Sequence, residues 1–164
     1  MKIADKIRQI LNSVLKAVCA CLLAFMSLLT CYQVFMRYVI KHPSTISEDI
    51  LSYSFVWVSL FATTLVFGER DHMNLTFFLD KFNFKVKTIV EILTEVLIGV
   101  IAVVVFFFGG IKFMSVGALQ VSPTLKITMN YIYVIMPICG ILICIYSILN
   151  IVKLLDDFRK GEQK

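Results

Sequence analysis

Long uncharged runs alternate with short charged segments along this chain of 164 residues. A helix needs about 20 residues to cross the roughly 30 Å hydrocarbon core of a bilayer. Three runs have about this length. The run at 96–111 reaches it when its helix begins near Lys85 and continues to about Gly117, with the end charges directed toward the lipid headgroups. The four predicted spans lie at about residues 12–38, 47–68, 86–117 and 127–153.

A shorter amphipathic pattern follows the second span, with Asn74 available as a helix cap. Its apolar residues recur at helical spacing: Leu75, Phe78, Leu79 and Phe82. We expect a short helix at about 74–84 in the cytoplasmic interface, although the same pattern also fits a groove on a partner protein. The predicted fold class is an all-α integral membrane protein, a single domain over residues 1–164 with four transmembrane helices and one interfacial helix.

Composition and charge agree with a membrane protein. Hydrophobic residues make up 59% of the chain and charged residues 16%, and the mean hydropathy is +0.88. Twelve of the sixteen lysines and arginines lie in the N-terminal segment, the loop between the second and third spans, and the C-terminal tail. The positive-inside rule then places both termini and that loop in the cytoplasm. The net charge of +5 reflects this topology, and no nucleic acid is expected as a partner.

The basic N-terminus before an apolar run also invites comparison with a cleavable export signal, whose apolar region has about 7–15 residues. Here the run has about 20 residues, lacks a small-x-small exit and is closed by Arg37. We therefore expect residues 12–38 to be retained as an anchor helix.

Prolines and glycines predict local features of the spans. Thr45 and Glu48 have the spacing of a capping box that begins the second span. Pro137 leaves the carbonyl of Tyr133 without its usual donor, so we expect a kink at which neighbouring helices satisfy the freed carbonyl. Glycines in the third and fourth spans are expected to form packing seams. They are Gly99, Gly109, Gly110, Gly117 and Gly140.

The stretch FGERDHMNL, residues 67–75, gathers acid, base and imidazole groups behind the second span. Asp71 and His72 are adjacent, and adjacent helical residues point about 100° apart, so this pair alone forms no catalytic relay. The other histidine, His42, falls on the opposite side of the membrane, which argues against a bis-histidine haem. We interpret the stretch as the cytoplasmic exit of the second span, with Gly68 relaxing the helix end.

Other reactive patterns are missing from the sequence. It contains no nucleophile motif, no glycine-rich phosphate loop and no paired-histidine zinc motif. The five cysteines lie inside predicted spans without metal-ligand spacing, and we expect them to be apolar packing groups. They are Cys19, Cys21, Cys31, Cys139 and Cys144. We predict no cofactor and no enzyme activity.

Lys87, Glu91 and Glu95 follow one another at steps of four at the start of the third span. We interpret this stripe chiefly as a solvated face, and otherwise as a face that meets a membrane partner. No span carries an ionisable residue at its centre, and a proton-coupled carrier needs one. The chain is therefore better suited to support a transporter than to transport alone. An independent small carrier or a channel-forming oligomer remains the alternative.

Three stretches together resemble one known family. The first stretch closes the first span with Arg37 and reads VFMRYVI. The second carries Glu48, Trp57, Arg70 and His72 and reads SEDILSYSFVWVSLFATTLVFGERDHMNL. The third lies in the fourth span and reads NYIYVIMPICGILICI. They are similar to the small membrane subunit of tripartite ATP-independent periplasmic (TRAP) transporters, the DctQ-like family. The resemblance covers nearly the whole chain. One departure is Phe61-Ala62, where the family often has a glycine, and it affects helix packing locally.

The resemblance implies a sodium-driven importer of three components in the bacterial inner membrane. A periplasmic substrate-binding protein captures an organic acid, such as a C4-dicarboxylate or a sialic acid, and a large membrane subunit carries the substrate and sodium sites. The small subunit is then a scaffold that supports the large subunit and helps the binding protein dock. A sialic acid is the favoured substrate on general resemblance.

Eight residues are candidate partner contacts, and none is expected to be catalytic or to bind a metal or cofactor. At the outer face, charges could orient a binding protein, or could anchor headgroups and cap a helix. The residues there are Arg37, Lys41, Glu48 and Asp49. At the inner face, Glu69, Arg70 and His72 pair with one another, with the large subunit, or with solvent. Trp57 is expected mainly as a group that faces the lipid bilayer or packs between helices.

Overall fold

The computed structural model describes residues 2–42, 44–69 and 84–161, and it is helical over nearly all of them. The first half contains α1 (Lys2–Phe35), the π-helix η1 (Met36–Ile40) and α2 (Thr45–Glu69). The second half contains α4 (Phe84–Ile101), the π-helix η3 (Ala102–Gly109), α5 (Gly110–Gly117), α6 (Asn130–Tyr133) and α7 (Ile135–Gly161).

Four of these helical segments are long and apolar enough to cross a membrane. They are Lys6–Ile40, Thr45–Glu69, Ile89–Gly117 and Asn130–Val152. The prediction of an all-helical chain with four membrane-spanning helices is thereby confirmed. The interfacial helix expected at about 74–84 falls almost entirely outside the described residues.

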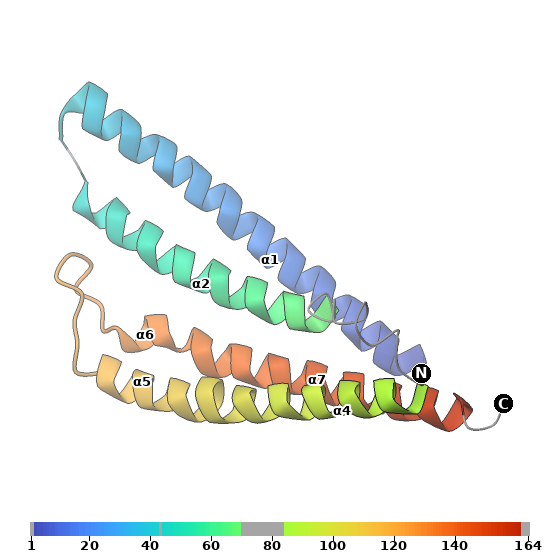
Figure 1. The fold of residues 1–164 in the computed structure, drawn as a ribbon. Helices are drawn as coiled ribbons and strands as arrows, with labels where there is room; N and C mark the ends of the chain where they lie inside the picture. Colours follow the sequence, from blue (N-terminus) through green and yellow to red (C-terminus); the bar gives the residue numbers. More distant parts are fainter. Residues whose placement is uncertain (1, 43, 70–83, 162–164) are drawn as a thin grey trace.

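Each helix packs chiefly on its neighbours in the order α1, α2, α7, α4 (Figure 1). The start of α1 and the end of α7 lie at one end of these helices, which we call the terminal end (Figure 1). The connections at 41–44 and 118–129 lie at the other, which we call the loop end (Figure 1). In the apolar part of the fourth span 39% of the residues are buried, compared with 6–11% in the other spans. α7 is therefore the most enclosed helix.

The buried face of the fourth span follows a regular spacing. Its residues recur at intervals of three or four, the pattern of a helix that presents one stripe to its neighbours. They are Ile132, Ile135, Cys139, Ile143, Tyr146, Asn150 and Leu154. Because apolar residues also cover the other faces of this helix, the stripe is defined by its contacts and not by hydrophobicity alone.

Glycines allow the third and fourth spans to approach closely, as the sequence predicts. A Cβ atom added at Gly110 would lie 2.8 Å from Cδ of Pro137, and one added at Gly140 would lie 2.9 Å from Cβ of Phe106. Side chains larger than hydrogen do not fit at these two positions without a shift of the opposing helix. The predicted seam is confirmed at Gly110 and Gly140, but the prediction is wrong for Gly109, where an added Cβ would make only an ordinary contact within its own helical segment.

The fourth span is interrupted at Val134, between α6 and α7. Pro137 explains the break because it has no N–H with which to complete the helical bond to residue 133. Trp57 of α2 donates through Nε1 to the carbonyl of Ile132 at 3.1 Å. A neighbouring helix thus supplies a donor at the interrupted turn, one residue before the carbonyl singled out from the sequence.

Gly110→Ala tests the seam, with Gly109→Ala as its matched control. A Cβ added at Gly109 has only an ordinary contact, 3.7 Å from the carbonyl oxygen of Val104. Both changes raise helix propensity, but overpacking at Gly110 should lower the free energy of unfolding by about 1–3 kcal/mol. Thermal unfolding in detergent micelles should show a lower Tm for Gly110→Ala than for Gly109→Ala. Equal melting temperatures would show that this contact does not limit the packing.

Candidate partner-binding surfaces

Arg37 and Glu48 join the first two spans at the loop end. Nη2 of Arg37 donates to Oε1 of Glu48 at 3.1 Å. The chain reverses direction just beyond Arg37, where Lys41 adopts a left-handed conformation with φ of 59°. The two side chains are 60% and 54% exposed, so water screens the ion pair and it contributes less than about 1 kcal/mol. The pair orients the two helix ends more than it stabilises them.

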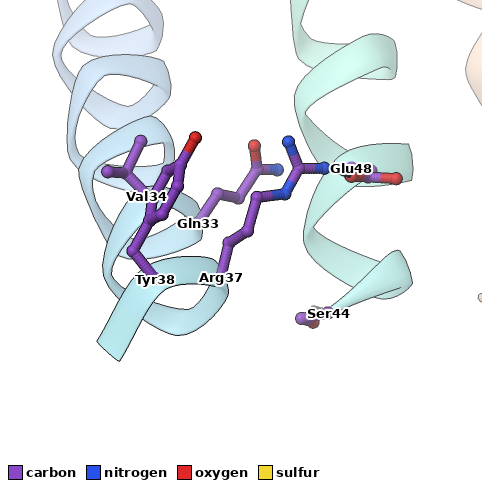
Figure 2. Close-up of a pocket in the computed structure, with 6 residues that line it drawn as sticks. All are labelled: Gln33, Val34, Arg37, Tyr38, Ser44 and Glu48. Carbon is purple, nitrogen blue, oxygen red and sulfur yellow. Dashed lines mark hydrogen bonds and ion pairs between the residues drawn. The ribbon is translucent and has the colours of Figure 1, made fainter. Parts of the chain in front are cut away.

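A pocket of about 250 Å³ lies between the end of the first span and the start of α2 (Figure 2). It is lined by Gln33, Val34, Arg37, Tyr38, Ser44 and Glu48. Figure 2 shows Gln33 and Arg37 extending from the first helix toward the second. Among the residues that the structure describes, Nε2 of Gln33 is buried and has no hydrogen-bond partner.

Asp49 binds the second connection of the loop end. Oδ2 of Asp49 accepts a hydrogen bond from Oγ of Ser122 at 3.1 Å and a second one from the hydroxyl of Thr124. The connection is also closed by its own backbone, since N–H of Ser122 donates to the carbonyl of Ile127 at 2.9 Å. Lys126 lies on its exposed side with φ of 53°. Asp49 was expected from the sequence at a partner interface, and its carboxylate holds a loop of its own chain.

At the terminal end, Glu69 forms an ion pair with Lys16 of α1. The neighbouring carbonyl, that of Gly68, accepts from Nε of Arg8 at 2.8 Å. Gly68 is buried, and an added Cβ would lie 2.7 Å from the ring of Tyr146. Gly68 is the penultimate residue of α2, as expected for the end of the second span, and it also lets the side chains of Tyr146 and Asn12 approach closely.

Asn12 and Tyr146 complete that contact. The Tyr146 hydroxyl donates to Oδ1 of Asn12 at 2.6 Å, which ties α7 to α1 across the end of α2. Sequence reasoning missed both residues, although a tyrosine and an asparagine within otherwise apolar spans were a usable signal. The predicted contacts Arg70 and His72 lie outside the described residues.

Glu95 differs from the solvated face expected for its stripe. It is only 3% exposed, and Oε1 accepts from Nδ2 of Asn150 at 3.0 Å. Its backbone carbonyl accepts from Oγ of Ser147 at 2.7 Å. The spacing of four correctly places Glu91 and Glu95 on the same face of α4. α7 packs over this face at Glu95, whereas Glu91 is only half-buried. The carboxyl group of Glu95 therefore joins α4 to α7 inside an apolar segment.

No group of three or more His, Cys, Asp or Glu residues is placed to hold a metal ion within the described ranges. Several polar contacts in those ranges join one helix or loop to another, among them those of Arg8, Asp49, Trp57 and Glu95. A chain with four spanning helices held in this way is a multi-pass membrane protein.

The chain belongs to the family of tripartite ATP-independent periplasmic transporters, DctQ component, which its residues 26–157 match. It is 24% identical over 154 residues to a Haemophilus influenzae protein provisionally named a TRAP transporter small permease protein, covering 94% of this chain and 95% of the relative. It is 25% identical over 154 residues to the sialic acid TRAP transporter small permease protein SiaQ of Vibrio cholerae, covering 91% and 87%. The family resemblance drawn from the sequence is confirmed: this is a small permease component, and the family is one of transport components.

Replacement of Glu95 tests the contact between α4 and α7. Glu95→Ala removes the acceptor of a buried hydrogen bond, which costs about 1–3 kcal/mol, whereas Glu95→Gln retains an acceptor oxygen and should stay close to the parent protein. Glu91→Ala, on the same helix and only half-buried, is the control. We expect thermal unfolding in detergent to rank Glu95→Ala well below the other two. A melting temperature for Glu95→Ala equal to that of Glu91→Ala would contradict a structural role for the buried carboxyl.

Proposed function

We propose that this chain is the scaffold subunit of a sodium-driven TRAP importer for organic acids. It lies in the bacterial inner membrane with both termini in the cytoplasm, supports the large transport subunit, and helps to dock the periplasmic substrate-binding protein. The substrate class is a C4-dicarboxylate, a sialic acid or a similar carboxylate. The name of the Vibrio cholerae relative favours a sialic acid within this class.

The main support is that polar groups form hydrogen bonds between neighbouring helices inside the layer of α1, α2, α7 and α4. The contact of Glu95 with Asn150 joins α4 to α7, and that of Trp57 with Ile132 joins α2 to the fourth span. Ionisable groups within the spans of transporters commonly face a substrate or ion pathway. Glu95 instead faces α7, where it is buried and bonded to Asn150, which supports a subunit that holds its shape while another subunit moves.

The exposed surface supports a neighbour in the membrane. Large apolar side chains are exposed on all four spans, for example Leu28 at 73%, Phe55 at 61%, Phe108 at 59% and Ile148 at 61%. A layer of helices leaves more of this surface free than a closed bundle does. Lipid tails cover such a surface, and the helices of a large membrane subunit can replace them on one face.

Reconstitution separates the scaffold from an independent carrier. When co-expressed with the large TRAP subunit of the same organism, the chain should co-purify with it from detergent. Proteoliposomes should take up substrate only when the large subunit, the loaded binding protein and a sodium gradient are all present. Proteoliposomes with this chain alone should show no uptake above empty vesicles. Uptake by the chain alone would overturn the proposal in favour of a small carrier or channel-forming oligomer.

For the binding protein, we propose that the two exposed lysines of the loop end provide the docking charge. Lys41 and Lys126 lie on the two connections. The ion pair of Arg37 with Glu48 fixes the first connection, and Asp49 fixes the second through Ser122 and Thr124. In this proposal the predicted contacts Arg37, Glu48 and Asp49 position the two connections. These carry Lys41, which the sequence also predicted as a contact, and Lys126, which it did not.

Charge reversal tests the docking proposal. The double change Lys41→Glu and Lys126→Glu should slow association of the loaded binding protein with the nanodisc-embedded complex about tenfold at low salt, because opposite charges steer the encounter. The difference should shrink above the physiological ionic strength. Lys112→Glu, an exposed cation on α5, is the control. An association rate unaffected by the double change, measured by surface plasmon resonance, would exclude these lysines from docking.

A further inference from the structure

The pocket between the first two spans has an unusual set of polar groups for its place in the chain. Gln33 and Arg37 lie within two turns of the end of the apolar segment Lys6–Ile40, and Glu48 lies one turn inside Thr45–Glu69. In a bilayer this level is the boundary between hydrocarbon and headgroups. The pocket is therefore placed where a lipid changes from its acyl chains to its polar head.

The groups in the pocket carry both signs of charge. Arg37 has five N–H donors on its guanidinium, and the bond to Glu48 occupies Nη2. Nε2 of Gln33 is a buried donor that no described residue satisfies. Glu48 supplies carboxylate oxygens on the opposite wall, and Oε1 is the one bonded to Arg37. An occupant with a phosphodiester beside an ammonium group would match these walls, because the Arg37 and Glu48 charges sum to zero.

Apolar side chains border the same pocket. Val34 and Tyr38 line it and are 52% and 71% exposed, and the next residues, Phe35 and Val39, are 55% and 64% exposed. Figure 2 shows Val34 and Tyr38 on the same helix as the donors Gln33 and Arg37. A polar cavity that adjoins exposed apolar surface favours a headgroup with attached acyl chains over a free soluble anion. The volume of about 250 Å³ equals that of about eight water molecules, enough for a phosphoethanolamine group.

We propose that this pocket is a binding site for one phosphatidylethanolamine molecule. Arg37 and Gln33 donate to its phosphodiester, the carboxylate of Glu48 accepts from its ammonium group, and the acyl chains run along Val34 and Tyr38. The bound lipid would fill the space between the ends of the first two spans. The site does not include the lysines proposed for docking, but its residues Arg37 and Glu48 also form the ion pair at the connection that carries Lys41.

The site can be tested by measuring lipid retained by the purified complex of this chain with the large subunit. The complex is washed with detergent, incubated with equal amounts of phosphatidylethanolamine and phosphatidylglycerol of matched chains, and analysed by native mass spectrometry. Wild type should retain one phosphatidylethanolamine in preference to phosphatidylglycerol. Gln33→Leu and Arg37→Ala should each lower retention about tenfold, since each removes a donor to a charged phosphate. Lys112→Ala, a cation outside the pocket, should leave retention unchanged.

Glu48→Gln tests the choice of lipid headgroup, which would not change if Glu48 served only to hold the two helices together. It raises the net charge of the pocket by one, so the preference should shift from phosphatidylethanolamine toward phosphatidylglycerol. Gln33→Leu leaves the Arg37–Glu48 pair in place, and unchanged circular dichroism of that variant separates lost binding from lost folding. Equal retention of both lipids by wild type, or displacement by equimolar soluble glycerophosphoethanolamine, would overturn the proposal. It would also be overturned if only the chain without the large subunit bound the lipid, because a protein contact would then fill the pocket.

Discussion

The arrangement depends on the hydrogen bonds and close contacts of α7 with its neighbours. In a bilayer, apolar side chains gain little by leaving lipid for protein, so packing of small residues and buried hydrogen bonds must hold helices together. α7 supplies both. Tyr146 reaches α1 at Asn12, and Asn150 binds the carboxyl group of Glu95 on α4. Gly140 lets η3 approach. These contacts make α7, which lies between α2 and α4, the most enclosed of the four spanning helices.

This interior position connects structure with function. Polar groups bonded between helices hold a fixed shape, while the outer surfaces remain apolar and available to lipid and to a large membrane neighbour. At the loop end, charged groups also position other parts of the chain. Asp49 and the pair of Arg37 with Glu48 hold the connections that carry Lys41 and Lys126. In the proposed role, a small permease component built in this way would provide surface and rigidity to its large neighbour, and the family to which the chain belongs is a component of tripartite transporters.

The sequence was sufficient for the four spans, because charges interrupt the apolar runs, and for the family, because Arg37, Trp57 and the stretch around Pro137 form a recognisable combination. It was not sufficient for the inner face of α7, since apolar residues also cover the other faces of its membrane-spanning part and only the polar residues Tyr146, Ser147 and Asn150 mark the buried one. Glu95 was misread because a spacing of four defines a helix face but not what covers it. The role of Asp49 depends on Ser122 and Thr124, which lie 73 and 75 residues further along the chain. Only the fold brings these groups together.

In the proposed role, this chain stays rigid while the importer works. This rigidity is tested most directly by the distance between bioorthogonal spin labels at His42 and Leu119, one on each connection of the loop end, in the complete importer in nanodiscs. We predict one distance distribution that is the same with and without sodium and with and without loaded binding protein. A second distance that appears with substrate and sodium would contradict the scaffold account, because it would show that the helices of this chain move during transport.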